Sequence, residues 1–181
     1  PFDLARDCAS VRPADVVETA ECWALALEAE GTPSVLALSR QNLPQLRKDG
    51  GMLCAKGGYR MKSAEAARQV VLVATGSEVE IALACAAELE TAGIGADVVS
   101  MPCTELFDAQ DAAYRADVLP AGVLKVSIEA GVTLGWQKYV GDGLTIGIDR
   151  FGASAPAEAL YSYFGLTSQA IVPQIKARLG H

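Results

Sequence analysis

The run Val70-Val71-Leu72-Val73-Ala74-Thr75 is followed at once by Gly76-Ser77-Glu78 and an alanine-rich stretch that ends near Ala92-Gly93. A short apolar, β-branched run bounded by a glycine is typical of a strand buried on both faces. The alanine-rich stretch favours a helix, and the apolar run over residues 96–100 predicts the next strand. A strand, a crossover helix and a second strand indicate a parallel sheet.

The same alternation continues on both sides of this unit. We expect further strands over residues 34–38, 123–129 and 144–148, helices over 15–30, 136–140, 156–164 and 167–179, and short helices between 103 and 119. The strand over 34–38 is expected to be buried. The sequence therefore predicts an α/β fold, a mostly parallel, Rossmann-like twisted sheet wrapped by helices and preceded by a partial α/β segment.

The first expected helix has a clear start. Asp15 can accept a hydrogen bond from the first-turn amides, and Glu18 lies three residues on, as in a capping box. Helical spacing places the apolar side chains on one face, which predicts that this face packs against the fold. These side chains belong to Val16, Ala20, Trp23 and Leu27.

Residues 39–66 are polar and glycine-rich, and they predict a functional loop that runs into an interdomain linker. We therefore divide the chain into residues 1–48, a linker over 49–66 and a unit over 67–181. We expect the last unit to fold on its own, and residues 1–50 not to, because one helix and one strand cannot complete a sheet.

Composition narrows the classes of function. The 181 residues are 51% hydrophobic, with a formal net charge of −7. The apolar content excludes disorder, and the negative charge argues against a nucleic-acid partner. The longest apolar runs have only a few residues, which is too short for a membrane span. The five cysteines form no C-x-x-C motif and indicate reduced, mostly buried thiols in a cytosolic protein. The single histidine, His181, leaves no base for a catalytic triad and no zinc ligand set.

Three short segments are candidate sites. The Gly76 turn lies where open α/β sheets bind phosphates, but Glu78 would compete for the helix amides, which favours a self-capped helix. Gly141-Asp142-Gly143 resembles part of a thiamine diphosphate motif, yet no asparagine follows it, so we predict a turn. Ser39-Arg40-Gln41 follows a predicted parallel strand, where an arginine can bind a phosphate or form a surface ion pair.

Several segments together resemble the C-terminal half of transketolase. The end of that family's middle, pyrimidine-binding domain resembles Arg12-Pro13-Ala14-Asp15, Glu18-Thr19-Ala20-Glu21 and Leu38-Ser39-Arg40-Gln41-Asn42-Leu43-Pro44. Its C-terminal domain resembles Val73-Ala74-Thr75-Gly76-Ser77-Glu78-Val79, Val99-Ser100-Met101-Pro102, Glu105-Leu106-Phe107-Asp108, Glu129-Ala130-Gly131 and residues 146–154. The ordered set spans about residues 12 to 167. Deoxyxylulose-phosphate synthase shares the architecture but fits residues 39–44 and 146–154 less well.

The resemblance implies a homodimeric, cytoplasmic enzyme of the pentose phosphate pathway that moves a two-carbon ketol unit between sugar phosphates. It implies thiamine diphosphate and a divalent metal (Mg or Ca), held by the N-terminal and remaining middle domain. Arg40 matches the family arginine that binds the sugar's terminal phosphate, with Ser39 and Gln41 beside it. No catalytic, cofactor or metal residue is carried over, so we expect the chain alone to be inactive and without cofactor.

The chain begins at Pro1, so we expect a fragment or a processed chain. The alternative to an enzyme fragment is a stand-alone binding or regulatory module that uses the Gly76 turn for a small anion.

Overall fold

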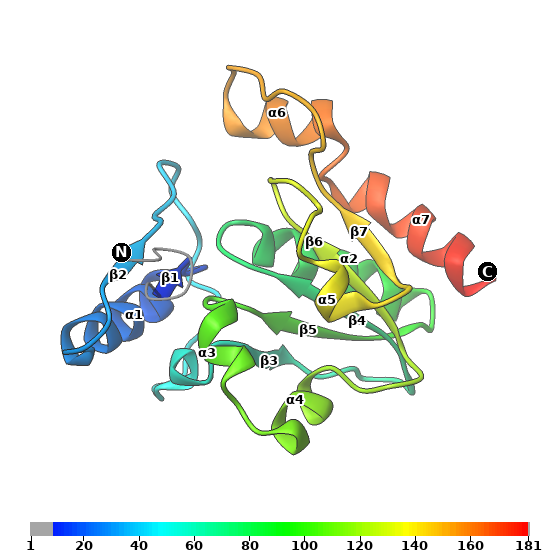
Figure 1. Cartoon of the computed structure of the whole chain (residues 1–181). Helices are drawn as coiled ribbons and strands as arrows, with labels where there is room; N and C mark the ends of the chain where they lie inside the picture. Colours follow the sequence, from blue (N-terminus) through cyan, green and yellow to red (C-terminus); the bar gives the residue numbers. More distant parts are fainter. Residues whose placement is uncertain (1–8, 181) are drawn as a thin grey trace.

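The computed structural model describes residues 9–180. Within them the main sheet has five strands in the order β3-β5-β4-β6-β7, all parallel except β3, which runs antiparallel to β5 (Figure 1). The strands are β3 (Tyr59–Lys62), β4 (Arg68–Ala74), β5 (Gly95–Ser100), β6 (Leu124–Ile128) and β7 (Leu144–Ile146). The helices are α2 (Glu78–Thr91), α3 (Thr104–Asp108), α4 (Ala112–Val118), α5 (Gln137–Val140), α6 (Ala157–Phe164) and α7 (Ser168–Leu179). The predicted fold class is confirmed.

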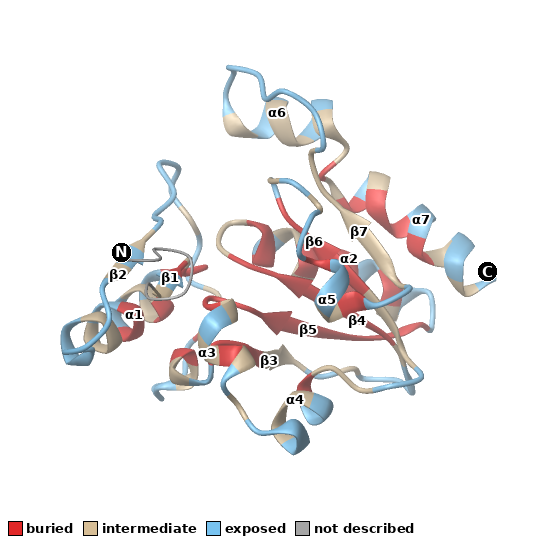
Figure 2. Ribbon diagram, viewed as in Figure 1, coloured by how far each residue is buried: buried red, intermediate tan, exposed pale blue. Residues whose placement is uncertain are grey.

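The central strand β4 is buried on both faces, as its unbroken apolar run predicts (Figure 2). Val70, Leu72 and Ala74 face a core that α2 and α7 cover. The alternate residues Val71 and Val73 face a second core built with side chains of α3, α4 and α5. The two-residue period of a strand thus divides one apolar run between two cores.

Strand β3 lies inside the segment predicted to be an interdomain linker, so part of that segment belongs to the main sheet. Residues 49–66 contain a 3-10 helix, η1 (Leu53–Lys56), and then β3, the antiparallel edge of the main sheet. Asp97 of β5 is 1% exposed and pairs with Arg60 at 2.8 Å and Arg68 at 3.0 Å. Arg60 of this segment, together with Arg68 of β4, thus neutralises a buried carboxylate of the main sheet.

The N-terminal segment forms a separate two-stranded parallel sheet, β1 (Ala9–Val11) with β2 (Ser34–Leu36), connected by α1 (Val16–Glu28). Figure 1 shows this segment beside the end of the main sheet, near α3. β2 is shorter than the predicted strand, and its residues are exposed or half-buried. It is not a buried strand because β1 is its only neighbour in the described part of the chain.

The capping prediction for α1 is confirmed, whereas the predicted packing face is wrong. Asp15 Oδ1 accepts from the Glu18 amide at 2.8 Å, and Glu18 Oε2 accepts from the Ala14 amide at 2.7 Å. The apolar face is open, with Trp23 50% and Leu27 78% exposed. The buried residues of α1 are Glu18, Glu21 and Cys22, on the other side of the helix. The periodicity identified an apolar face but not its partner.

None of the helices over residues 9–180 is both long and apolar enough to cross a membrane.

Candidate functional site

Strand β4 is the point where the order of the sheet reverses, because the chain continues to β5 on one side and to β6 on the other. Open α/β sheets bind ligands in the crevice at the carboxyl ends of such strands. Here the main chain of Arg12 lies against the turn that follows β4: its carbonyl accepts from the Gly76 amide at 3.1 Å and from Thr75 Oγ1 at 3.2 Å. Together with the Glu78 carboxylate in the first turn of α2, this contact occupies the turn. The alternative of a free anion site at Gly76 is therefore not supported, and the first amides of α2, those of Glu78 and Val79, donate to the Thr75 and Gly76 carbonyls of the same turn.

The side chain of Arg12 forms an ion pair with Glu129, which follows β6. Glu129 is 3% exposed, and its Oε2 has no hydrogen-bond partner among the described residues. Burial raises the pKa of Glu129 to about 7, although Arg12 acts to lower it; the neighbouring Glu78 carboxylate raises it further. The ion pair joins the N-terminal segment to the main sheet.

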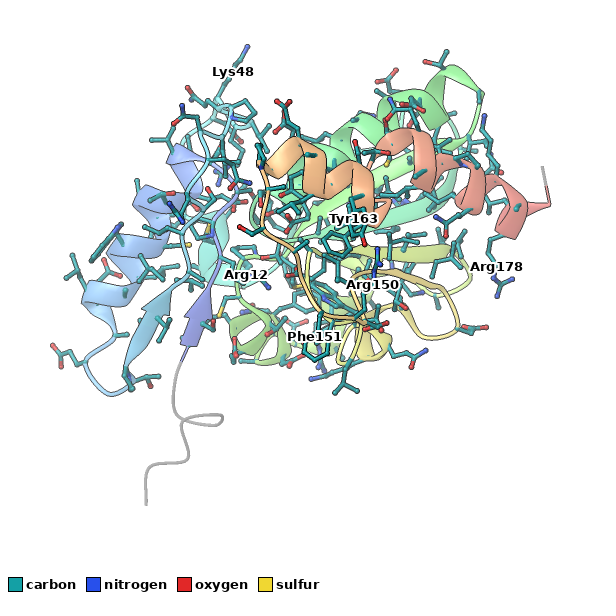
Figure 3. All side chains as sticks on the ribbon, turned by 90° about the horizontal axis from the view of Figure 1, so that it is seen from above. Arg12, Lys48, Arg150, Phe151, Tyr163 and Arg178 are labelled. Atoms are coloured by element: carbon teal, nitrogen blue, oxygen red, sulfur yellow. The ribbon has the colours of Figure 1, made fainter. Side chains whose placement is uncertain are left out.

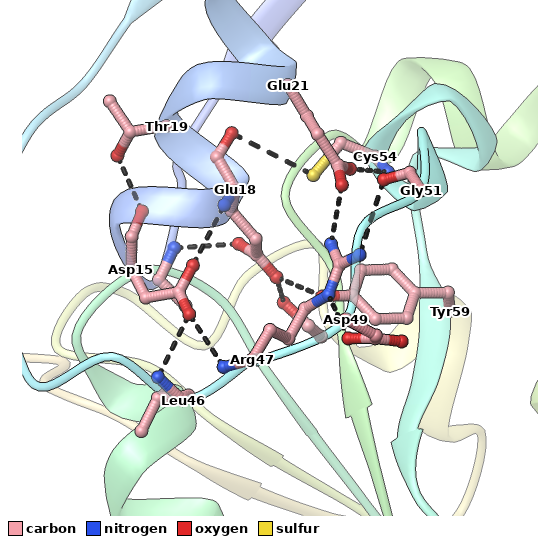
Figure 4. A network of polar contacts seen from close by, with 12 residues as sticks. Asp15, Glu18, Thr19, Glu21, Leu46, Arg47, Asp49, Gly51, Cys54 and Tyr59 are labelled. Atoms are coloured by element: carbon pink, nitrogen blue, oxygen red, sulfur yellow. Dashed lines mark hydrogen bonds and ion pairs between the residues drawn. The ribbon is translucent and has the colours of Figure 1, made fainter.

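A second, larger polar contact joins the two parts of the molecule (Figure 4). The carboxylate of Glu18 is fully buried and accepts from Tyr59 Oη of β3 and Ser100 Oγ of β5, both at 2.6 Å. Neither donor carries a charge, and burial raises the pKa of Glu18 despite these hydrogen bonds. The Glu18 carboxylate of α1, in the N-terminal segment, is therefore hydrogen-bonded to two strands of the main sheet.

Arg47 completes this network from the loop after β2. Its guanidinium lies 2.9 Å from Glu21 Oε1, without the alignment of a hydrogen bond, and 5.1 Å from the ring centre of Tyr59. Asp15 Oδ2 accepts from the amides of Leu46 and Arg47 at 2.9 and 2.8 Å. Figure 4 shows these side chains converging from α1, the loop and β3. The end of the loop is thereby fixed to the N-terminus of α1.

The predicted site residues Ser39, Arg40 and Gln41 lie on the exposed loop between β2 and η1. Ser39 and Gln41 line a cavity of about 360 Å³ whose other wall includes α6. Arg40 does not line it, and within the described residues it has no ion pair or hydrogen bond. The ion-pair alternative for Arg40 is thus unsupported, and its guanidinium is available to an anion.

The other sequence-based candidates are structural. Gly141 has a φ of 63° where α5 ends, and a Cβ on Gly143 would lie 2.0 Å from the Lys125 carbonyl. This segment is the predicted turn, and it does not fit a cofactor site. Among residues 9–180, no three His, Cys, Asp or Glu side chains are grouped as metal ligands would be. Cys22, Cys54, Cys85 and Cys103 are free and buried, as predicted, whereas Cys8 and His181 lie outside the described residues.

Sequence reasoning missed the role of three residues that connect the two parts of the chain. Arg12 and Glu129 entered only as pieces of a family pattern, and Tyr161 of α6 was not singled out. The Tyr161 hydroxyl lies 2.7 Å from Glu78 Oε1 and accepts from Gln41 Nε2 at 3.3 Å. The position of Glu129 as the last residue of the predicted strand over 123–129 was the one available signal, because polar residues at the carboxyl end of a strand face the crevice.

Comparisons with known proteins agree with this architecture. Residues 57–167 match the family described as "Transketolase-like TK C-terminal domain". The chain is 54% identical over 177 residues to transketolase of Rhodobacter capsulatus, covering 93% of this chain and 26% of that protein. It is 51% identical to the chloroplastic transketolase of Solanum tuberosum, covering 91% and 23%. A structure of a transketolase mutant from Pichia stipitis in complex with fructose 6-phosphate superposes with a TM-score of 0.87 at 39% identity, covering 94% and 25%.

The chain thus spans about a quarter of the length of the relatives it matches. The domain match, the identities near 50% and the superposition all cover the unit built on β3 to β7, and the last two extend into the N-terminal segment. The chain belongs to the transketolase family and carries its C-terminal domain.

Proposed function

We propose that this chain acts as part of a homodimeric transketolase that transfers a two-carbon ketol unit between sugar phosphates in the pentose phosphate pathway. Residues up to 48 are then the end of the pyrimidine-binding domain, and the unit that begins at β3 is the C-terminal domain. The observation that carries the proposal is the family match together with Arg40, an exposed guanidinium with no protein partner in the described part of the chain.

Arg40 is the residue to which we assign substrate contact. A guanidinium offers a planar set of donors that fits two oxygens of a phosphate. Arg40 would bind the terminal phosphate of the sugar, with Ser39 and Gln41 as neighbours on the same loop. The complex of the Pichia stipitis protein with fructose 6-phosphate supports this substrate class.

Thiamine diphosphate and a divalent metal, Mg or Ca, belong to the remainder of the enzyme in this proposal. The cofactor supplies the carbanion chemistry, and the residues of this chain contribute phosphate binding and structural support. We place the enzyme in the cytoplasm, although the Solanum tuberosum relative is named as chloroplastic.

The open face of α1 supports the proposal that the remaining middle domain packs on this chain. Val16 is 64% exposed, Trp23 50% and Leu27 78%, and all three lie on one side of the helix. The sheet formed by β1 and β2 has no third strand among the described residues. Two-stranded sheets are marginal alone, and an apolar helix face of this size is normally covered.

The test is Arg40→Ala in the full-length enzyme that contains this sequence. Loss of a charge-assisted hydrogen bond costs about 1.5–3 kcal/mol, so kcat/KM for phosphorylated substrates should fall about 10- to 150-fold. Arg40→Lys should restore part of this loss, because it keeps the charge without the planar fork. Substrates that lack a phosphate should react at nearly unchanged rates.

Arg178→Ala is the matched control for loss of one positive charge. Arg178 lies in α7, where it donates to the Asp142 carbonyl at 3.1 Å, and Figure 3 shows it at the far end of the molecule from Arg12. This variant should leave both substrate classes unaffected. Equal losses for phosphorylated and unphosphorylated substrates in Arg40→Ala would overturn the assignment.

A further inference from the structure

The loop that carries Arg40 is fixed at both of its ends. At the start, the Ala37 amide donates to the Val11 carbonyl at 2.9 Å, continuing the pairing of β2 with β1. At the end, Asp15 Oδ2 accepts from the amides of Leu46 and Arg47. Both anchors belong to the N-terminal segment, so neither one connects the loop to the C-terminal domain.

Between these anchors the loop has one tether to another element. Across residues 38–44, in the part of the chain that the structure describes, the only hydrogen bond that leaves the loop is Gln41 Nε2 to Tyr161 Oη, at 3.3 Å. Ser39 Oγ donates to the Gln41 carbonyl at 3.3 Å, which is a contact inside the loop. The tether therefore starts from the residue next to Arg40 and ends on α6 of the C-terminal domain.

Tyr161 is itself held in place from the other side. Its hydroxyl lies 2.7 Å from Glu78 Oε1 and 3.0 Å from Ser77 Oγ, at the start of α2. Burial, and then the Glu78 carboxylate, raise the pKa of Tyr161 to about 12. The phenol is thus protonated at neutral pH, donates its proton to Glu78, and keeps its oxygen lone pairs for Gln41.

We propose that Tyr161 is a positioning residue for the phosphate-binding loop: through Gln41 it holds residues 38–44 in the conformation from which Arg40 contacts the substrate phosphate. This inference rests on the proposed function of Arg40. It gives the C-terminal domain a part in substrate recognition, because hydrogen bonds through Tyr161 connect Glu78, at the start of α2, to a loop of the preceding domain.

The test is Tyr161→Phe in the full-length enzyme, with Tyr163→Phe as the matched control. Tyr163 lies on the same helix, is 62% exposed, and its hydroxyl accepts from Arg150 at 3.3 Å instead of from the loop. Figure 3 shows Arg150 and Tyr163 together, away from Arg12. Both variants remove one hydroxyl from α6, but only one of them removes the tether.

Two readouts are expected to change in Tyr161→Phe. A net hydrogen bond contributes about 1 kcal/mol, so tryptic cleavage of the native protein after Arg40 should accelerate about fivefold. KM for phosphorylated substrates should rise by a similar factor with kcat little changed, and unphosphorylated substrates should be unaffected. Gln41→Ala should add little in the Tyr161→Phe background, because both changes break the same contact.

The outcomes separate this inference from the proposed function. If Tyr161→Phe matches Tyr163→Phe in cleavage rate and in KM, the positioning role is overturned, even where Arg40→Ala selectively impairs phosphorylated substrates. If Arg40→Ala impairs both substrate classes equally, the proposed function fails, and with it the link from Tyr161 to phosphate binding.

Discussion

Helices α1 and α2 differ by one residue in length, yet they pack on the molecule through opposite kinds of side chain. α2 buries an apolar face that includes Val79, Cys85 and Leu89 against the main sheet. α1 buries Glu18, Glu21 and Cys22 and leaves its apolar side open (Figure 2). A buried carboxylate needs partners that fit it, whereas apolar burial is non-directional. Burial of apolar surface area therefore holds α2 against the main sheet, whereas a specific set of hydrogen bonds holds α1.

This difference indicates that the two faces of α1 bind different surfaces. The polar face recognises one surface of the C-terminal domain, where Tyr59 and Ser100 supply the donors. The apolar face carries the exposed area that a further domain would cover. If α1 were an ordinary surface helix, its buried and exposed faces would be exchanged.

The strongest way to break the polar contact is Arg47→Ala. This change leaves Glu21 as an uncompensated buried carboxylate, and breaking a buried ion pair in this way typically costs about 3–5 kcal/mol. Lys48→Ala is the control, because Lys48 is exposed and Figure 3 shows it extending from the surface. In chemical denaturation, the free energy of unfolding of Arg47→Ala should be lower than that of Lys48→Ala by that amount. Similar denaturation midpoints for the two variants would mean that other contacts hold α1.

A second prediction concerns pH and the ion pair of Arg12 with Glu129. The folded-state pKa of Glu129, about 7, exceeds its ordinary value of 4.5, so the folded protein binds more protons than the unfolded chain between these values. The stabilising contribution of this group is complete below pH 4.5 and is lost as pH rises through 7, by at most about 3 kcal/mol. Glu18, whose pKa is also raised, acts in the same direction.

Glu129→Gln should flatten this dependence, because the amide does not ionise. Unfolding midpoints measured from pH 4.5 to 8 in both proteins give the comparison. An unchanged slope in the variant would show that Glu129 titrates near its ordinary value and that the ion pair with Arg12 outweighs burial.

The smallest effect is expected on the open face of α1. Leu27 is 78% exposed, so Leu27→Ser should change the stability of this chain by less than about 0.5 kcal/mol. In the full-length enzyme the same change should cost about 1.5–3 kcal/mol, the value of burying a leucine, if the remaining middle domain covers this face. Glu28→Ser is the control, and equal effects of Leu27→Ser in both proteins would contradict the proposed packing.

The sequence predicted the parallel sheet and its helices because their apolar runs are long enough to identify each element. It did not predict β3, because Tyr59, Arg60 and Lys62 resemble a polar linker until Asp97 is known to lie opposite two arginines. Nor did it predict the packing of α1, since periodicity identifies a face and not what covers it. Arg40 was identified through family resemblance, whereas Tyr161 depends on a contact across 120 positions of the chain.

The Arg12–Glu129 contact also affects the order in which the protein can form. The two partners are 117 positions apart, and Glu18 reaches Ser100 across 82. During synthesis at about 5–20 residues per second, α1 leaves the ribosome roughly 6–20 s before Glu129 does. Throughout this interval Arg12 lacks its partner, whereas Tyr59 and Ser100, the partners of Glu18, emerge before Glu129 does. We therefore expect the N-terminal segment to complete its contacts with the main sheet only after β6 and Glu129 have emerged.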